Sequence, residues 1–302
     1  MTKSAQSRGY VGWIGVGKMG NPMAMRLIEA GYNLIINDPL PENRASLVAR
    51  GAHVAALPED VAEQCRIIFS MIPNDNVLND LIYGTQGSLG LLKAVKTGTV
   101  FVEMSTVSPY ISEKIAKDLS NLGVSYLRCP VSGSTLLARA GDLTILGSGE
   151  AKAWKEVLPI IDVLAKQKFY LGQGEEARYM KLVLNMLVGA TSSILGEAML
   201  LGKQGGLTPS SMMDVIVESA VASPLIRYKQ EMVAHMDFAP AFSVLQMIKD
   251  MQLITRTGQE KHVPMFMANQ ILQQYEVAAN VGYAEHDFFV LFDWMQTSYG
   301  LA

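Results

Sequence analysis

One lysine stands in an unusually apolar part of this sequence. The stretch 174–205 contains no proline, and only Lys181 and Glu197 are ionisable in its centre. If the stretch is one helix, a rotation of about 100° per residue places Lys181 and Asn185 on the same narrow face. A buried ammonium group needs a partner or a task, because burying an unpaired charge is costly. A lysine whose proton affinity is lowered by burial can act as an acid and a base in catalysis.

Two other interpretations of this stretch compete with catalysis. Residues 182–202 have the length of a membrane span, but Asn185, Glu197 and three glycines are poor residues for a lipid environment. The stretch can also be the core helix of a soluble protein, in which the lysine extends its ammonium group to the surface. Taken alone, the stretch favours this second interpretation, so the rest of the chain has to decide.

A glycine-rich junction near the N-terminus has the spacing of a dinucleotide-binding loop. Residues 10–17 form an apolar run typical of a buried strand, and 18–31 have the pattern of an amphipathic helix. Between them the order is G-x-G-x-x-G, which suits a tight turn, the close approach of a pyrophosphate and helix–strand packing. The helix N-terminus then offers N–H groups to the phosphates. The predicted cofactor loop consists of Gly15, Gly17, Lys18, Met19 and Gly20.

An acidic residue follows the next predicted strand. Asp38 lies about twenty residues beyond the glycines, where a carboxylate binds the ribose hydroxyls of NAD. A carboxylate at this place repels the additional phosphate of NADP, so the sequence favours NAD, with NADP possible because Arg44 is near in sequence. Asp38 can also serve only to begin the turn D-P-L-P, and both roles can hold together.

The first half of the chain alternates between the two kinds of pattern. Strands are predicted at 10–17, 32–38, 53–55, 66–72, 99–105, 124–130, 142–149 and 168–172. Helices are predicted at 18–31, 41–50, 58–64, 75–83, 109–121 and 150–166. This alternation is typical of a parallel sheet covered on both faces, whose ligands bind at the carboxyl ends of the strands. The segments MIPND, MSTVSP and CPVSGS each follow a strand end, so they are predicted to line one crevice.

The second half has no strand patterns. Apolar residues recur at helical spacing in five segments beyond the long stretch, at 209–219, 224–235, 242–260, 264–281 and 285–298. The predicted fold class is therefore α/β, with a Rossmann-type doubly wound sheet followed by an all-α domain joined to it by a long helix. The predicted domains are 1–172, which binds NAD(P), and 173–302, which serves substrate binding and oligomerisation.

Composition excludes several classes of protein. With 302 residues, of which 49% are hydrophobic, and a net charge of −3, the chain has ample core material and no basic surface for nucleic acid or a polybasic membrane contact. The first residues are polar and lack the apolar region of a secretory leader. Cys65 and Cys129 show neither metal-ligand spacing nor a disulfide framework, and the four histidines are scattered. We therefore expect a cytoplasmic protein with no metal site.

The ordered set of motifs resembles the β-hydroxyacid dehydrogenase family, which belongs to the 6-phosphogluconate dehydrogenase superfamily and is typified by 3-hydroxyisobutyrate dehydrogenase and tartronate semialdehyde reductase. The resembling blocks, in order, are GWIGVGKMGNPMAMRL, CPVSGSTLLARAGDLTILGSG, KLVLN and KDMQL, followed by EHDFFVLF, which contains Asp287. The resemblance covers essentially the whole chain. It implies an oxidoreductase that transfers a hydride between NAD(P) and a short β-hydroxy acid or its semialdehyde.

The resemblance also implies roles for individual residues. Lys181 is expected to be the general acid/base that exchanges a proton with the substrate hydroxyl. The residues expected to bind substrate are Ser132, Gly133, Ser134, Asn185 and Lys249, and Lys249 is also expected to reach the cofactor. The residues expected to line the nicotinamide end are Ile72, Pro73 and Thr106. The resemblance further implies a homodimer or homotetramer.

Departures from the family pattern concentrate in the substrate loop. Arg128 stands where the family usually has an acidic residue, Cys129 replaces an alanine, and Ser134 replaces a second glycine. Ala177 replaces the glycine that usually lies four residues before the lysine. We hypothesise that Arg128 and Ser134 adjust recognition of an anionic or polar substrate group.

Two other functions remain open at this point. One is reduction of an imine or another carbonyl on the same fold, and the other is a catalytically silent dinucleotide-binding module. Relatives of both kinds generally lack the lysine, so Lys181 favours the dehydrogenase.

Overall fold

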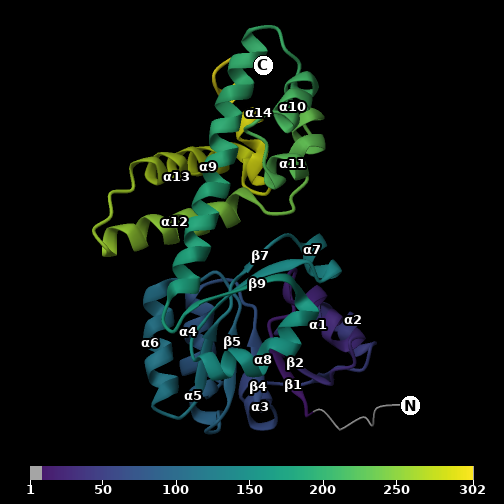
Figure 1. Ribbon diagram of the computed structural model, residues 1–302, viewed down its shortest axis with the longest axis vertical. Coiled ribbons are helices and arrows are strands. Elements are labelled where there is room, and N and C mark those ends of the chain that lie inside the picture. The colour runs from purple at the N-terminus through teal and green to yellow at the C-terminus, as the bar shows by residue number, and fades with distance from the viewer. Residues whose placement is uncertain (1–8, 302) are drawn as a thin grey trace. The chain divides into compact units, whose positions relative to one another are not determined.

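A computed structural model describes residues 9–301, and the polar first residues, 1–8, lie outside this range. The chain divides into two compact units, Met1–Lys181 and Leu182–Ala302. The first contains a sheet with helices, and the second contains helices (Figure 1). The long helix α9, Glu176–Gln204, begins in the first unit and continues into the second.

Over residues 9–181 the first unit has one sheet of nine strands. They are β1 (Val11–Ile14), β2 (Leu34–Asn37), β3 (His53–Val54), β4 (Ile67–Ser70), β5 (Val100–Glu103), β6 (Ser125–Arg128), β7 (Val131–Ser132), β8 (Leu143–Ser148) and β9 (Ala165–Gly172). Their order is β3-β2-β1-β4-β5-β6-β8-β7, and β9 pairs with β8. The strand order reverses direction between β1 and β4, which makes the loops after these two strands the switch point at which doubly wound sheets bind ligands.

The sheet is mixed rather than parallel throughout, which corrects the prediction. Strands β1 to β6 are parallel, but β8 runs antiparallel to both β6 and β7. The segment between β6 and β8 contains only the two-residue β7 and the short helix α7 (Thr135–Ala140). A parallel crossover needs a connection about as long as a full helix, so this segment folds back as a reversal. The fourteen-residue helix α8 (Ala151–Leu164) then returns the chain to β9, parallel to β8.

Alternating strand residues build a core on each face of the sheet. On one face Trp13 and Ile36 pack with residues of α1 and α8, and on the other Ile14 and Phe101 pack with residues of α3, α4 and α6. Figure 1 shows the sheet with helices on both sides. The remaining helices of this unit are α1 (Gly20–Glu29), α2 (Pro41–Val48), α3 (Pro58–Gln64), α4 (Asp75–Tyr83), α5 (Leu91–Ala94) and α6 (Pro109–Ser120).

The second unit is all-helical around one apolar core. Besides α9, its elements are α10 (Pro209–Glu218), α11 (Pro224–Ala234), α12 (Val244–Glu260), α13 (Phe266–Ala278), η1 (Ala279–Tyr283), η2 (Phe288–Val290) and α14 (Leu291–Ser298). The glycines of α9 serve close packing here. A Cβ on Gly189 would lie 3.1 Å from the Met247 sulfur, and one on Gly196 would lie 3.2 Å from the backbone nitrogen of Phe292.

Candidate active site

The glycine loop lies at the switch point between β1 and β4. Gly15 has φ +83°, and a Cβ on it would come within 2.3 Å of the Met71 carbonyl oxygen, in the loop after β4. A Cβ on Gly20, the first residue of α1, would come within 2.0 Å of the Gly15 carbonyl oxygen. Both positions therefore exclude a side chain because protein backbone lies there.

Gly17 is different, because the space beside it is open. A Cβ on Gly17 would meet only the Asn43 amide nitrogen, at 3.9 Å. The backbone N–H groups of Gly17, Lys18 and Met19 donate to no acceptor among residues 9–301. An open glycine and unpaired N–H groups just before the N-terminus of α1 fit the phosphates of a dinucleotide.

Asp38 holds this loop in place. Its carboxylate is buried at the end of β2 and accepts hydrogen bonds from the Val16 N–H at 2.8 Å and the Leu40 N–H at 2.9 Å. The Asn43 amide donates to the same carboxylate at 3.0 Å. The side chain thus begins the turn after β2, one of its two predicted roles, and it also fixes the backbone of the glycine loop.

The loops after β4 and β5 are tied together through Ser105. The Ile72 N–H donates to the Ser105 hydroxyl at 2.7 Å, and the Ser105 N–H donates to the Glu103 carboxylate at 2.8 Å. Thr106 follows directly and is partly buried, whereas Pro73 is exposed. All three predicted nicotinamide-lining residues therefore lie on two loops that are joined by one buried serine.

The predicted substrate loop connects β7 to α7. Ser132 is the last residue of β7, and Gly133 has φ +139°, a conformation that favours glycine. Ser134 is the N-cap of α7, and its hydroxyl accepts from the Leu137 N–H at 3.5 Å. This capping geometry gives Ser134 a local structural role, and its role in substrate recognition stays a prediction.

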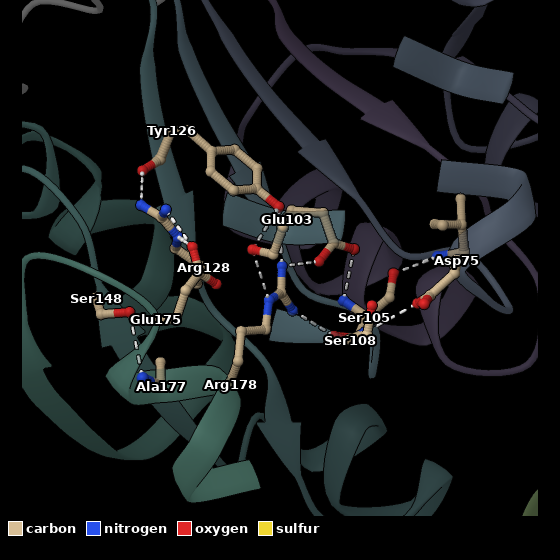
Figure 2. A network of polar contacts seen from close by, with 12 residues as sticks. Asp75, Glu103, Ser105, Ser108, Tyr126, Arg128, Ser148, Glu175, Ala177 and Arg178 are labelled. Carbon is tan, nitrogen blue, oxygen red and sulfur yellow. Dashed lines mark hydrogen bonds and ion pairs between the residues drawn. The ribbon is translucent and has the colours of Figure 1, made fainter. Parts of the chain in front are cut away.

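Arg128 makes its contacts with other residues of the protein. Its buried guanidinium pairs with the Glu175 carboxylate, donates to the Tyr126 carbonyl oxygen at 3.3 Å and lies 4.7 Å from the centre of the Tyr126 ring. Our hypothesis that Arg128 adjusts substrate recognition therefore lacks support from the geometry. The arginine instead fixes Glu175, the residue that precedes α9 (Figure 2).

The first turn of α9 is anchored in the same region. The Ala177 N–H donates to the Ser148 hydroxyl at 3.2 Å, and that hydroxyl donates to the Gly174 carbonyl oxygen at 2.8 Å. Arg178 is buried and forms an ion pair with Glu103, while its guanidinium also donates to the Ser105 carbonyl oxygen at 2.6 Å (Figure 2). Burial alone would lower the pKa of the Arg178 guanidinium, but the charge of Glu103 beside it raises that pKa above its ordinary value. The side chain therefore stays charged.

Lys181 lies three residues beyond Arg178. It is partly buried and is the last residue of the first unit. In a helix, residues three apart are neighbours on one side. The sequence prediction therefore places the candidate acid/base one turn beyond a side chain that is fixed to the loop carrying Thr106. The sequence did not predict the contact between Arg178 and the loop that carries Thr106.

The second unit contains the other predicted residues. The Asn185 amide, which is buried, donates to the Asp250 carboxylate, and the Lys249 ammonium lies 2.9 Å from the other oxygen of that carboxylate. The structure therefore brings Asn185 and Lys249 together through Asp250, a residue of the KDMQL block for which no role was predicted.

Asp287 lies in the core of the second unit. Its carboxylate pairs with the Lys229 ammonium at 2.7 Å and accepts hydrogen bonds from the backbone N–H groups of Ala241, Phe242 and Phe289. All of these partners belong to the second unit, so the Asp287 carboxylate holds segments of that unit together. Within residues 9–301 no cluster of three or more histidine, cysteine, aspartate or glutamate side chains is arranged to hold a metal ion.

Two family models together match almost the whole chain. The NAD-binding domain of 6-phosphogluconate dehydrogenase matches residues 10–172, and the NAD-binding domain of NADP-dependent 3-hydroxyisobutyrate dehydrogenase matches residues 172–294. The chain is 34% identical to 2-(hydroxymethyl)glutarate dehydrogenase from Eubacterium barkeri, over 92% of this chain and 91% of that protein. The chain belongs to the β-hydroxyacid dehydrogenase family. It is thus an NAD(P)-dependent oxidoreductase of the dehydrogenase and reductase class.

Other members of the β-hydroxyacid dehydrogenase family have the same extent. Glyoxylate/succinic semialdehyde reductase 1 from Arabidopsis thaliana is 29% identical over 95% of this chain and 99% of that protein. The crystal structure of 3-hydroxyisobutyrate dehydrogenase from Salmonella typhimurium superposes with a TM-score of 0.84 at 25% identity, covering 95% of this chain and all of that one. The predicted fold class is confirmed by this likeness.

Proposed function

We propose that the protein catalyses the reversible oxidation of a short β-hydroxy acid to its semialdehyde, with Lys181 as the general acid/base. In oxidation the neutral Lys181 amine takes the proton from the substrate hydroxyl, and in reduction its ammonium form returns that proton. Bound NAD(P) supplies the hydride acceptor and donor. The observation that carries the proposal is the position of Lys181, one helical turn beyond a side chain fixed to the strand-end loop of β5.

The cofactor is assigned to the first unit. Gly17, Lys18 and Met19 would hold the pyrophosphate, since their N–H groups lack an acceptor among the described residues and Gly17 leaves room. Ile72 and Thr106, with Pro73 beside them, would line the nicotinamide end, because their loops follow β4 and β5 at the carboxyl edge of the sheet. Gly15 and Gly20 shape the loop, as their packing against backbone requires.

We propose NAD as the preferred cofactor. The Asp38 carboxylate stands at the end of β2 and is an anion at the place where NADP carries its additional phosphate. The Oδ2 atom accepts one protein hydrogen bond, from Val16, which leaves it capacity to accept another from a ribose hydroxyl.

The substrate is proposed to be a small carboxylate. Ser132 and the Gly133 N–H would bind its carboxylate group, since Ser132 is partly exposed at the end of β7 and Gly133 is exposed directly after it. Asn185 would hold the reacting hydroxyl end, and its amide is already oriented by Asp250. Lys249 would contribute a positive charge for the substrate carboxylate or the cofactor. The named substrates of the relatives, 2-(hydroxymethyl)glutarate, glyoxylate and succinic semialdehyde, are all small carboxylates.

We further propose that the protein is a cytoplasmic homo-oligomer. In α9, large apolar side chains are exposed along one side, and those at Leu187, Ile194 and Leu201 are 61%, 63% and 77% exposed. Their spacing of seven residues forms a stripe that a second copy of the chain could cover. The same helix is long and apolar enough to span a membrane by composition, but 44% of its most apolar window is buried inside the protein. Both cysteines are free and buried, as suits a reducing compartment.

A substrate panel tests the proposal. The purified protein is assayed by NAD(P)H absorbance with both cofactors against 3-hydroxyisobutyrate, 2-(hydroxymethyl)glutarate, 4-hydroxybutyrate, serine, tartronate semialdehyde, succinic semialdehyde and glyoxylate. We expect turnover of at least one of these carboxylates and a higher kcat/KM with NAD(H). The variant Lys166→Ala, which loses an exposed lysine, is the control, and its kcat should equal that of the native chain. Cofactor binding without turnover of any hydroxy acid or semialdehyde, together with reduction of a cyclic imine, would contradict the proposal.

A further inference from the structure

A buried guanidinium joins helix α9 to the strand-end loops of the first unit. Arg178 is 1% exposed, and its partner Glu103 is fully buried. The Arg178 side chain uses all three of its nitrogens. Besides Glu103 and the Ser105 carbonyl oxygen, it donates to the Ser112 hydroxyl at 3.3 Å and the Tyr126 hydroxyl at 3.1 Å. A pair this deeply buried carries a large desolvation cost, so its net contribution to stability is not a sufficient reason for its presence.

The partners of Arg178 form the frame of the nicotinamide end. Glu103 is the last residue of β5, and both its carboxylate oxygens are engaged, one by Arg178 and one by the Ser105 N–H. The Ser105 hydroxyl in turn accepts from the Ile72 N–H. Figure 2 shows Arg178 beside Glu103 and Ser105. One guanidinium therefore holds the loop that carries Thr106 and, through Ser105, the loop that carries Ile72.

The same guanidinium fixes the rotation and height of the helix that carries Lys181. Three residues of helix correspond to a rise of about 4.5 Å and leave the two side chains on neighbouring positions of one side. The Arg128–Glu175 pair and the bond from Ala177 to Ser148 fix the residues just before Arg178. The start of α9 can therefore neither turn nor slide without breaking buried charge-assisted hydrogen bonds.

We propose that the Arg178–Glu103 pair positions Lys181 relative to the loops that carry Ile72 and Thr106. This inference rests on the proposed role of Lys181. Arg178 itself contacts neither substrate nor cofactor in this account and acts through the helix. Its planar guanidinium with several donors is needed because it must reach Glu103 and the Ser105 carbonyl oxygen together, which the single ammonium of a lysine does not reproduce.

A double-mutant cycle between Arg178→Lys and Lys181→Ala tests the proposal. The assay uses the best substrate of the panel, saturating cofactor, and a temperature at which all variants are folded by circular dichroism. Arg178→Lys should lower kcat about 10-fold or more in the native background, because small displacements of a catalytic group are costly. The substrate KM and the Kd of NAD(P)H should stay within about threefold.

The decisive result is what Arg178→Lys does once Lys181 is absent. In the Lys181→Ala background it should change the residual kcat less than about twofold, because the positioned group is gone. An equal loss in both backgrounds would show an independent structural role and overturn the inference. If Lys181→Ala alone left turnover intact, the proposed function would fail instead, so the two failures are distinguishable.

Hydrogen exchange provides a second measurement that needs no substrate. In Arg178→Lys, amides of residues 176–181 and of the Thr106 loop should exchange about 10-fold faster or more, while amides of α12 keep their rates. Glu103→Gln should have the same effect in a weaker form, since it keeps an acceptor but loses the charge. Unchanged exchange at both segments in both variants would contradict the positioning role.

Discussion

Each unit of the molecule contains an ion pair that is almost completely buried, and these two pairs have different hydrogen-bond partners. Arg178 and Glu103 are 1% and 0% exposed, and their further hydrogen bonds go to strand-end loops and to a serine and a tyrosine. Lys229 and Asp287 are 3% and 0% exposed, and the further bonds of Asp287 go to backbone N–H groups of its own unit's loops. Similar burial thus serves two purposes, one at a candidate site and one in a core.

The two pairs differ in whether they can affect the position of Lys181 as well as the stability of the fold. Removing either cation leaves a buried carboxylate unpaired, so both changes should destabilise the fold. Only the first pair has a member on the helix that carries Lys181, because Arg178 lies in α9 one turn before the lysine. Activity measured on the folded fraction should therefore respond to the first pair and not to the second.

The largest effect is expected from Arg178→Met and Lys229→Met. Each should lower the free energy of unfolding by about 3–5 kcal/mol, because a buried charge loses its partner. Urea unfolding measures this. At a temperature where both variants are folded, Arg178→Met should also lose at least about 10-fold in kcat, whereas Lys229→Met should keep kcat within about twofold. Equal losses of kcat in the two variants would break the comparison.

A smaller effect is expected at Asp38, another hydrogen-bonded carboxylate of the first unit. Asp38→Asn removes the negative charge and retains an acceptor oxygen for the Val16 N–H. The ratio of kcat/KM for NAD(H) to that for NADP(H) should fall about 10-fold, because repulsion of the additional phosphate is lost. Asp60→Asn is the matched control, because the Asp60 carboxylate in α3 also accepts a hydrogen bond from a backbone N–H, that of Leu57. An unchanged ratio in Asp38→Asn would count against the ribose contact.

The smallest effect concerns the response of the two units to high pH. Both cysteines belong to the first unit, and burial raises the pKa of the Cys65 thiol to about 11 and raises that of Cys129 as well. In the unfolded chain these thiols ionise near pH 8.5. The unfolded state therefore binds fewer protons in this range, and stability that is full below pH 8 falls as pH rises toward 11.

Urea unfolding at pH 8 and pH 10 measures this loss. The free energy of unfolding should fall by about 1–2 kcal/mol per buried thiol, and Cys65→Ala should show a smaller fall than the native chain. If the native chain and Cys65→Ala have the same pH dependence, the buried thiol does not contribute in this way.

The fold was predictable in its class because each strand carries its own local signal. The glycine junction after β1 and the alternation of strands with helices indicated the doubly wound sheet, and loss of that alternation indicated the helical part. The antiparallel β8 was missed because direction depends on the connection. The segment between β6 and β8 contains a two-residue strand and a six-residue helix, which are too short for a clear periodic signal.

Residues of the candidate site that belong to a sequence motif could be predicted. Residues that are joined only by tertiary contacts could not. Lys181, Asn185 and the glycine loop have characteristic spacings. Arg178 and Glu103 are 75 residues apart in the chain, so no local pattern joins them. One signal was available, since a glutamate inside the apolar run TVFVEMS requires a buried partner. The same reasoning applies to Arg128, whose buried side chain pairs with Glu175.

We propose that Lys181 transfers the substrate proton, and the kcat of Lys181→Ala tests this role, with cofactor binding followed in parallel by NAD(P)H fluorescence. We expect a kcat at least about 100-fold lower than that of the native chain, as for loss of a general acid/base, with the Kd of NAD(P)H within about threefold. A variant that turns over any substrate of the panel at the native rate would contradict it.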